Sequence, residues 1–479
     1  MKIALIASEV TPFAKTGGLA DVLGSLSGVL EQLGNEVFVI APAYSSVLRG
    51  GFALQKTAMR FSVPVADRSV SAQVLQSFIA KRVTTYFIRA DHYFDREFLY
   101  TTPAGDYPDN SERFVFFSRA ALELLRCQPV DVVHCHDWQT ALIPVYLKTQ
   151  AARYSETARA KTVFTIHNLG FQGIFGPADW PLLNLDSSLF TPQFLEFYGN
   201  INFLKGALLF ADKLTTVSPS YASEILTAEQ GFGLDGVLRQ RAGDLVGILN
   251  GVDYQIWNPW TDPFLTDHYG ENSLSQKSAC KETLRQIVGL PSWEDIPIIA
   301  MISRLTPQKG VDLVAGMLDE LMARGVQLIL LGNGDTRYED FFRAQMARFP
   351  KQIAVRIGFD NPLAHQIEAG ADIFLMPSLY EPCGLNQMFS LKYGTIPVVR
   401  AVGGLKDTVQ QCNVAASSGT GFLFASYTSE ALLAAVDECL MVYRNRPAWN
   451  ALQRRAMEMD FSWNRSAKNY TDLYRQLVS

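Results

Sequence analysis

The sequence has few cysteines and no long hydrophobic run. Its six cysteines, in 479 residues, include no Cys-x-x-Cys pair, which argues against a disulfide framework or a zinc framework. No apolar stretch approaches the ~18 residues that a membrane-spanning helix needs. The apolar start at residues 3–7 meets Ser8 and Glu9 too soon for the core of a signal peptide. We therefore expect a soluble, cytoplasmic protein with reduced thiols and no membrane partner.

An excess of positive charge is also lacking. Lys and Arg total 42 against 47 Asp and Glu, which gives a net charge of −5. A field of that sign argues against bulk nucleic-acid binding, so we expect no nucleic-acid partner. Hydrophobic residues make up 48% of the chain, enough for a sizeable core, and this excludes disordered, collagen-like and coiled-coil classes. The length predicts two or three domains.

Short apolar runs alternate with segments of helical periodicity from end to end. Residues 2–7 and 36–41 are predicted as buried strands, and the apolar residues of 19–33 repeat at helical spacing before Gly34. A strand, a helix and a strand within forty residues form a βαβ unit with parallel strands. The same alternation returns later, with strands predicted at 296–302, 326–331, 353–357, 372–376 and 396–399.

The break between the two halves is predicted near residues 245–260, where residues 248–253 give way to a segment rich in Trp, Pro and Asp, residues 257–263. We predict an α/β fold of two Rossmann-like domains facing a central cleft, covering residues 1–248 and 249–458. In open parallel sheets, ligands sit beyond the carboxyl ends of the strands, so both halves can line that cleft. Residues 463–478 are predicted to be helical, and residues 265–280 are interpreted as a polar connection.

A glycine turn with a lysine, Lys15-Thr16-Gly17-Gly18, lies between a predicted strand and a helix. Its backbone N–H groups, the helix start and the lysine together suit an anion. The alternative is a tight turn with a surface lysine. The turn matches neither a Walker loop nor a dinucleotide fingerprint. Its Gly-Gly-Leu sequence recurs at Gly403-Gly404-Leu405, again between a strand and a helix.

Two loops of the second half carry charged candidates. Arg304 and Lys309 follow the strand at 296–302, where fixed cations would stabilise a departing diphosphate; the alternative is a solvated basic loop. Glu381 follows the strand at 372–376, where it can bind sugar hydroxyls or a positive glycosyl centre. Its alternative is a helix N-cap acid. Cys383 has no adjacent His and is interpreted as a packed thiol.

Histidines close two strands of the first half. His134 and His136 share one strand face, with Cys135 and Asp137 on the other. A His-x-His pair can bind a metal, but no third ligand is identifiable, so we expect no metal site. Asp137 and His167 are predicted to reach the same sheet edge from neighbouring strands, which favours a functional role.

Taken together, these motifs resemble the bacterial glycogen synthase and plant starch synthase family. The resemblance covers essentially the whole chain. It rests on Lys15–Val22, His136-Asp137-Trp138, residues 165–169, Asn250-Gly251-Val252-Asp253, residues 303–310 and residues 381–385. It implies the GT-B glycosyltransferase fold, with residues 459–479 as a C-terminal helix returning to the first domain. It also implies retaining transfer of glucose from ADP-glucose to the non-reducing end of an α-1,4-glucan such as glycogen, releasing ADP. No metal or pyridoxal phosphate cofactor is expected.

The resemblance implies a role for each matched position. Asp137 and His167 would line the reacting sugar, Arg304 and Lys309 would hold the diphosphate, and Glu381 would contact the donor glucose; these are the expected catalytic residues. The expected substrate-binding residues are Lys15, Gly17, Gly18, Asp21, Asn168, Asn250, Cys383, Gly384, Leu385, Gly403 and Gly404. Departures from the commonest family pattern stand at Gly170, Phe171, Leu379 and Asn386, and they bear on donor or acceptor preference.

Three other functions stay open at this point. A GT-B enzyme using UDP- or GDP-sugar often has a second Glu eight residues after the first, where this chain has Phe389. A glycoside hydrolase would need two carboxylates, for which Glu381 and Asp137 are candidates, and a phosphorylase would need a pyridoxal-binding lysine. A non-catalytic glucan- or nucleotide-binding protein is the third. For the acceptor, residues 93–96 and 107–110 offer aromatic faces or are a partly packed loop.

Overall fold

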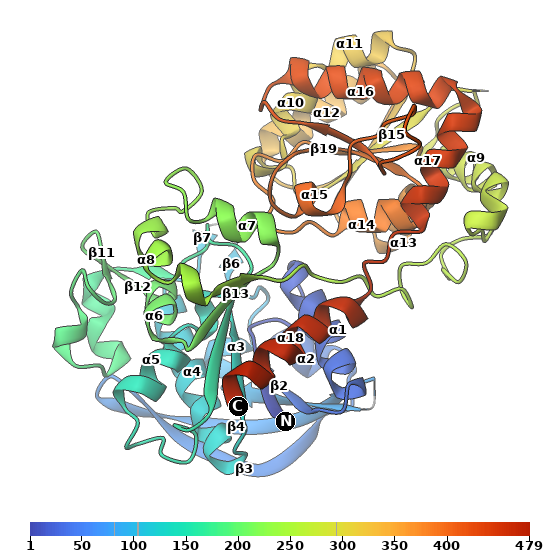
Figure 1. Cartoon of the computed structure of the whole chain (residues 1–479). Helices are drawn as coiled ribbons and strands as arrows, with labels where there is room; N and C mark the ends of the chain where they lie inside the picture. Colours follow the sequence, from blue (N-terminus) through green and yellow to red (C-terminus); the bar gives the residue numbers. More distant parts are fainter. Residues whose placement is uncertain (81, 103–104, 294) are drawn as a thin grey trace. The chain divides into compact units, whose positions relative to one another are not determined.

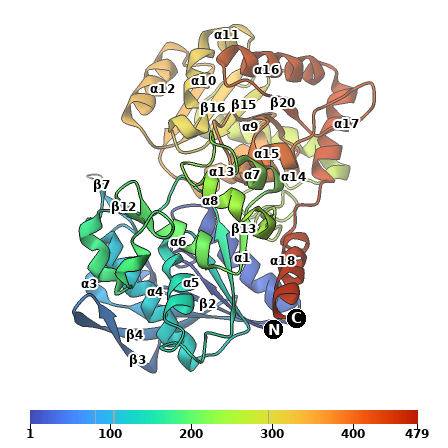
Figure 2. The ribbon, with the colours of Figure 1, turned by 60° about the vertical axis from the view of Figure 1, so that its left-hand side comes forward.

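The computed structural model describes residues 1–80, 82–102, 105–293 and 295–479, which divide into two compact units (Figures 1 and 2). Unit 1 comprises residues 1–217, 222–251 and 463–479, and unit 2 comprises residues 218–221 and 252–462. The chain thus crosses between the units after Gly251 and again after Ser462. The sequence placed these boundaries at 248/249 and 458/459. The difference arises because Val252 pairs with Ser462, and the Val252 N–H donates to Phe461 O at 2.7 Å.

Unit 1 is built on one large sheet, which has nine strands among the described residues. Their order across the sheet is β14 (Leu245–Gly247), β13 (Lys213–Thr216), β9 (Lys161–Ile166), β8 (Val132–His136), β1 (Lys2–Ile6), β2 (Glu36–Pro42), β5 (Val83–Arg89), β4 (Arg68–Ile79) and β3 (Gln55–Val65). All neighbours are parallel except β5–β4 and β4–β3. The antiparallel pair β3–β4 was not identified from the sequence.

Helices and two small sheets complete unit 1. The helices are α1 (Gly18–Gln32), α2 (Ser45–Arg49), α3 (Asp91–Phe94), α4 (Asn110–Cys127), α5 (Leu142–Thr149), α6 (Phe203–Phe210), α8 (Asp235–Gln240) and α18 (Trp463–Val478), and α7 (Pro219–Glu224) is divided between the units. The small sheets are β10 (Ile174–Phe175) with β12 (Asn200–Asn202) and β11 (Glu196–Phe197), and β6 (Thr101–Thr102) with β7 (Gly105–Asp106). The terminal helix α18 packs against α1 (Figure 1).

Unit 2 has a wholly parallel sheet. The order of its strands is β17 (Ile353–Ile357), β16 (Gln327–Gly332), β15 (Ile298–Ile302), β18 (Ile373–Met376), β19 (Ile396–Arg400) and β20 (Phe422–Phe424). The helices are α9 (Lys277–Val288), α10 (Val311–Gly316), α11 (Leu318–Ala323), α12 (Thr336–Arg348), α13 (Asn361–Gly370), α14 (Asn386–Lys392), α15 (Gly403–Thr408), α16 (Ser429–Arg444) and α17 (Arg446–Met457). The predicted strands match β15–β19 within two residues at each end, and the parallel α/β architecture predicted for both halves is confirmed.

The strands form where the sequence has short, uninterrupted apolar runs. Ile3, Leu5 and Ile6 of β1 are fully buried, as are Ile299 and Ala300 of β15. Burial on both faces is the condition of a parallel strand covered by helices, which explains why these runs do not alternate with polar residues. Helix α1 ends just before Gly34, whose φ of +85° is a backbone conformation that glycine adopts without strain.

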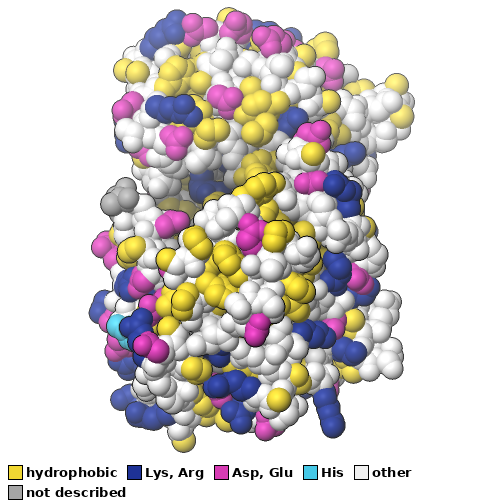
Figure 3. All heavy atoms as spheres, turned by 90° about the vertical axis from the view of Figure 1, so that its left-hand side faces the viewer, with side chains coloured by type: hydrophobic (Ala, Val, Ile, Leu, Met, Phe, Trp, Pro, Cys, Tyr) yellow, Lys and Arg dark blue, Asp and Glu magenta, His cyan; other side chains and the backbone are white. Residues whose placement is uncertain are grey.

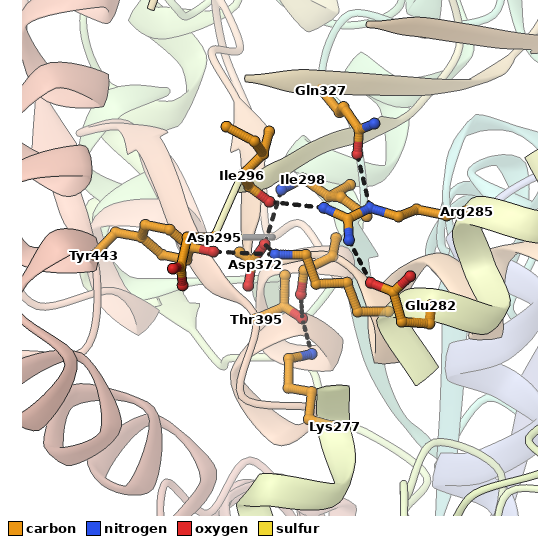
Figure 4. A network of polar contacts seen from close by, with 12 residues as sticks. Lys277, Glu282, Arg285, Asp295, Ile296, Ile298, Gln327, Asp372, Thr395 and Tyr443 are labelled. Atoms are coloured by element: carbon orange, nitrogen blue, oxygen red, sulfur yellow. Dashed lines mark hydrogen bonds and ion pairs between the residues drawn. The ribbon is translucent and has the colours of Figure 1, made fainter. Parts of the chain in front are cut away.

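The interpretation of residues 265–280 as a polar connection is wrong. Helix α9 begins at Lys277, and Tyr269 and Leu274 before it are buried. The polar residues are themselves part of the packing, because the buried Lys277 Nζ donates to Ala369 O and to Thr395 Oγ1, each at 2.7 Å (Figure 4). Buried, hydrogen-bonded polar groups of this kind cannot be told from solvated ones by composition.

The surface of the face that Figure 3 shows carries Lys and Arg side chains interspersed with Asp and Glu, without a broad field of one sign. Hydrophobic side chains also reach that surface. In unit 1, exposed apolar residues gather in sequence around β10–β12: Phe171, Ile174, Phe194 and Tyr198. No helix among the described residues is long and apolar enough to span a membrane.

Candidate active site

The strand order of unit 2 marks where its ligand should lie. Numbered within the unit, the order is 3-2-1-4-5-6, and it reverses between β15 and β18. In doubly wound sheets the crevice beyond the carboxyl ends of the strands at such a reversal is the usual ligand site. The loop after β15 carries Arg304 and Lys309, and the loop after β18 carries Glu381. The charged residues predicted from the sequence therefore flank the reversal.

Lys309 and Glu381 form a buried ion pair. Lys309 Nζ lies 2.6 Å from Glu381 Oε2, and their side chains are only 18% and 7% exposed. Ser378 Oγ donates to the same carboxylate oxygen at 2.9 Å. The interpretation of Glu381 as a helix N-cap acid is wrong, because α14 begins at Asn386. Glu381 is instead held by a lysine 72 residues away.

The two loops are locked together through their backbones. The Leu379 N–H donates to Gln308 O at 2.8 Å. Gly310 has φ +70°, and a Cβ at this position would lie 2.1 Å from Pro377 O, so no other residue fits without a shift of the backbone. Arg304 itself is exposed, and its guanidinium donates to Gln308 Oε1 at 3.3 Å. Lys309 is thus fixed in its ion pair with Glu381, whereas the side chain of Arg304 is exposed to solvent.

Gly403 and Gly404 contact the segment that carries Glu381. A Cβ on Gly403 would lie 2.0 Å from Glu381 O, and one on Gly404 would lie 2.2 Å from Cys383 O. The Gly404 N–H donates to Glu381 O at 3.1 Å. Close contact with backbone carbonyl groups therefore explains why both positions are glycine. The predicted contact of Gly403 and Gly404 with a donor stays a prediction. Cys383 is 5% exposed, as expected of a packed thiol, and Gly384 and Leu385 follow it before α14.

Unit 1 has a reversal of its own, between β1 and β8. On one side of the reversal the strands lie in the order β1, β2 and β5, and on the other in the order β8, β9, β13 and β14. The loop after β1 carries Glu9 and Lys15, and the residue directly after β8 is Asp137. Of the predicted residues of this half, Lys15 and Asp137 follow the strands that flank the reversal, and His167 follows the next strand, β9.

The glycine turn of unit 1 is already in contact with a carboxylate of the protein. The N–H groups of Thr16 and Gly17 donate to Glu9 Oε2, and Thr16 Oγ1 donates to Glu9 Oε1 at 2.6 Å. These two amides therefore already have an acceptor within the protein, and the predicted contact of the turn with an anion stays a prediction. Lys15 Nζ lies 2.7 Å from Asp21 Oδ1, and both side chains are more than a third exposed.

Glu9 is a polar residue of the site that the sequence analysis did not assign. It is 4% exposed and also accepts a hydrogen bond from Tyr100 OH at 2.8 Å. Its position just after the predicted buried strand at residues 2–7 could have identified Glu9 as a candidate site residue. Gly17 and Gly18 are exposed, and a Cβ on Gly17 would meet nothing within 4 Å. The space beside Gly17 is therefore open, unlike that beside Gly403.

Asp137 and His167 lie side by side, which confirms their predicted arrival at one sheet edge. The backbone N–H of His167 donates to Asp137 Oδ1 at 2.8 Å. Burial raises the pKa of Asp137 to about 7 and lowers the pKa of His167 to about 3. Asn168 Oδ1 accepts from the Gly170 N–H, and Asn250 is buried with no hydrogen bond to its Oδ1 among the described residues. A neutral imidazole beside a carboxyl group that titrates near neutrality is a typical active-site arrangement.

The raised pKa of Asp137 predicts a pH-dependent effect of Asp137→Asn on stability. Below about pH 4 the carboxyl group is protonated in both states; as the pH rises to about 7, the unfolded state ionises first and the folded state loses stability. Three pKa units set an upper limit of about 4 kcal/mol on that loss. Asp137→Asn keeps a side-chain oxygen that accepts from the backbone N–H of His167, but it carries no charge. The Tm of the variant relative to that of the wild type should therefore rise by several degrees from pH 5 to pH 8. Scanning calorimetry, with the exposed Asp67→Asn as control, measures this; an unchanged difference would contradict it.

The histidines of β8 have partners other than a metal ion. His134 Nδ1 lies 2.7 Å from Tyr474 OH, and its Nε2 lies 2.6 Å from Thr165 Oγ1. His136 Nδ1 lies 3.0 Å from His167 Nε2. Among the described residues, no three His, Cys, Asp or Glu side chains gather as metal ligands would. The His-x-His spacing reflects two residues on one face of a strand.

The two loops considered for the acceptor are largely packed. Tyr93 and Phe94 are buried, Asn110 is 3% exposed, and Arg96 forms an ion pair with Asp109. The Arg96 guanidinium also lies 4.8 Å from the centre of the Tyr107 ring. Of the two interpretations, the packed loop is the one that the structure supports, because these aromatic faces are covered by the protein.

Two family models match the chain, one in each half. Residues 2–240 match the family described as the starch synthase catalytic domain, and residues 282–454 match glycosyl transferases group 1. A glycogen synthase of Koribacter versatilis is 48% identical over 99% of this chain and 98% of its own length. One of Geobacillus thermodenitrificans is 47% identical over 100% and 98%.

Solved structures show the same relationship in three dimensions. The catalytic domain of starch synthase IV from Arabidopsis thaliana, solved with ADP and acarbose bound, superposes with a TM-score of 0.92 at 32% identity, covering 100% of this chain and 99% of that one. Sucrose-phosphate synthase from Thermosynechococcus elongatus has a TM-score of 0.62 at 18% identity over 99% and 98% of the two chains, which is a similarity of fold.

Proposed function

The chain belongs to the family of bacterial glycogen synthases and plant starch synthases, and from this premise we propose that it transfers glucose from ADP-glucose to the non-reducing end of an α-1,4-glucan, with retention. It is a glycosyltransferase of the GT-B fold. The single observation that carries the proposal is the buried Lys309–Glu381 pair at the strand-order reversal of unit 2. A cation and a carboxylate held together there suit the diphosphate and the sugar of one donor.

In the proposed reaction, the bond between the anomeric carbon and the ADP oxygen breaks, and a bond from the acceptor 4-hydroxyl oxygen forms on the same face. The hydroxyl proton passes to the released phosphate oxygen. Arg304 and Lys309 stabilise the charge that develops on the diphosphate, because fixed cations need no reorganisation as the bond breaks. Glu381, which Lys309 and Ser378 hold in place, contacts the donor glucose.

Unit 1 supplies the groups around the reacting sugar. Asp137 and His167 line it, Lys15 approaches the donor, and the open space beside Gly17 admits it. The proposal assigns the neutralisation of charge to side chains and includes no metal ion, so activity should persist after treatment with a chelator. We also place the reaction in the cytoplasm, which suits a chain with few cysteines and no Cys-x-x-Cys pair.

The decisive experiment measures labelled glucose incorporated into glycogen from ADP-glucose, UDP-glucose and GDP-glucose, with primer omitted as the control. We expect incorporation from ADP-glucose that depends on primer and releases ADP. A preference for UDP- or GDP-glucose would overturn the donor assignment. Release of free glucose from glucan without any nucleotide sugar would indicate a hydrolase, and tight donor binding without incorporation would indicate a binding protein.

A further inference from the structure

His136 is a buried histidine to which the proposed reaction gives no role. It ends β8, is fully buried, and its Nδ1 lies 3.0 Å from Nε2 of the half-buried His167. Its other ring nitrogen, Nε2, is buried and has no hydrogen-bond partner among the residues that the structure describes. The two rings are therefore joined by one hydrogen bond, which determines where each proton lies.

Both rings are neutral, because burial lowers the pKa of His136 well below its usual value and that of His167 to about 3. A neutral imidazole has one N–H and one lone-pair nitrogen, so one ring must donate and the other accept. If His167 donated, the His136 proton would sit on Nε2 as a buried N–H without an acceptor. If His136 donates, the same buried nitrogen is only an unused lone pair. Orphaned buried N–H groups are the rarer of the two in proteins, which favours His136 as the donor.

We propose that His136 is a positioning residue that donates its Nδ1–H to His167 Nε2 and thereby fixes His167 with its own proton on Nδ1. The second nitrogen of His167 then presents a hydrogen-bond donor. The part of this inference that concerns the substrate rests on the proposed function: the Nδ1–H of His167 contacts an oxygen of the donor sugar.

The ring of His134 packs against the ring of His136. The centres of the two rings are 4.1 Å apart, and both nitrogens of His134 are hydrogen-bonded, one to Tyr474 on α18 and one to Thr165 on β9. A ring with two hydrogen bonds cannot turn without breaking them. The terminal helix thus takes part in holding His136, and through it His167, in one orientation.

The direct test is ¹⁵N NMR of the full-length wild-type protein with labelled histidine, with the His167 signals assigned by comparison with His167→Ala. We expect His167 to show a protonated Nδ1 and an unprotonated Nε2, and His136 likewise. A protonated Nε2 on His167 would overturn the inference. This readout needs neither activity nor a His136 variant, so it stands apart from the incorporation assay that tests the proposed function.

Two variants test the consequence for the reaction. His136→Asn places an amide nitrogen near the position of Nδ1 and keeps the donor, whereas His136→Phe keeps a ring without one. We expect kcat to fall roughly 10- to 100-fold in H136F, with the KM for ADP-glucose nearly unchanged, and H136N to recover most of that loss. Tyr146→Phe, which removes a buried hydroxyl of unit 1 that donates to Leu183 O and not to a histidine, is the matched control. Equal activities of folded H136N and H136F would contradict the proposed role.

Discussion

Lys309→Ala is expected to lower kcat for transfer from ADP-glucose by about 10²–10³, the effect of removing one preorganised stabiliser of transition-state charge. The lysine is held in place by Glu381, 2.6 Å away, and is largely shielded from water. A fixed, shielded cation stabilises developing charge more than one on a mobile surface side chain does. Initial rates of labelled glucose incorporation at saturating donor measure the loss.

Removing Lys309 also leaves Glu381 buried without its cation, so activity and stability must be separated. Lys309→Ala combined with Glu381→Gln removes both charges and should be more stable than Lys309→Ala alone. If Lys309 acts on the donor, the double variant will turn over far more slowly than Glu381→Gln alone. Equal rates for those two would mean that the lysine serves only as the partner of the glutamate. Lys351→Ala, an exposed lysine of the same unit, is the control.

The parallel strands predicted above and the approximate places of the charged residues follow from local sequence, whereas the antiparallel pair β3–β4 was missed. Apolar runs such as Ile353–Ile357 are bounded by polar segments, so the strand has the predicted limits. The residues after a parallel strand must lie at its carboxyl edge, so Arg304 and Asp137 lie where they were expected. Helix α18, Trp463–Val478, was predicted at both ends from its apolar stripe.

The partners of those residues were not predictable in the same way. Lys309 and Glu381 are 72 residues apart and meet only because β15 and β18 are neighbours in the sheet, an order that one sequence does not reveal. Glu9 and Thr16 belong to one loop, yet whether their amides and carboxylate face each other depends on the path of that loop. Local sequence therefore indicated which side chains matter, and the sheet order decided what each one contacts.

The largest expected effect on stability is that of Asp372→Ala in unit 2. Asp372 Oδ2 accepts from the Ile298 N–H at 2.8 Å (Figure 4). It also lies 2.7 Å from Lys281 Nζ, so Asp372 connects α9 to the start of β15. Both charged side chains are less than 15% exposed. Removing one partner of a buried pair leaves the other charge uncompensated, which costs about 3–5 kcal/mol. For a unit of this size, that corresponds to roughly 6–20 °C in Tm.

Two further variants distinguish the buried charge from the hydrogen bond. Asp372→Asn keeps an oxygen that accepts from the Ile298 N–H but lacks the negative charge. Its loss of stability should therefore be measurable and smaller than that of Asp372→Ala. Asp319→Ala breaks an ion pair of similar length with Arg348 whose side chains are 59% and 55% exposed, and it should cost less than about 1 kcal/mol. Scanning calorimetry of the three variants measures these differences. Equal losses for Asp372→Ala and Asp319→Ala would contradict the argument, because burial is then not what makes the first pair strong.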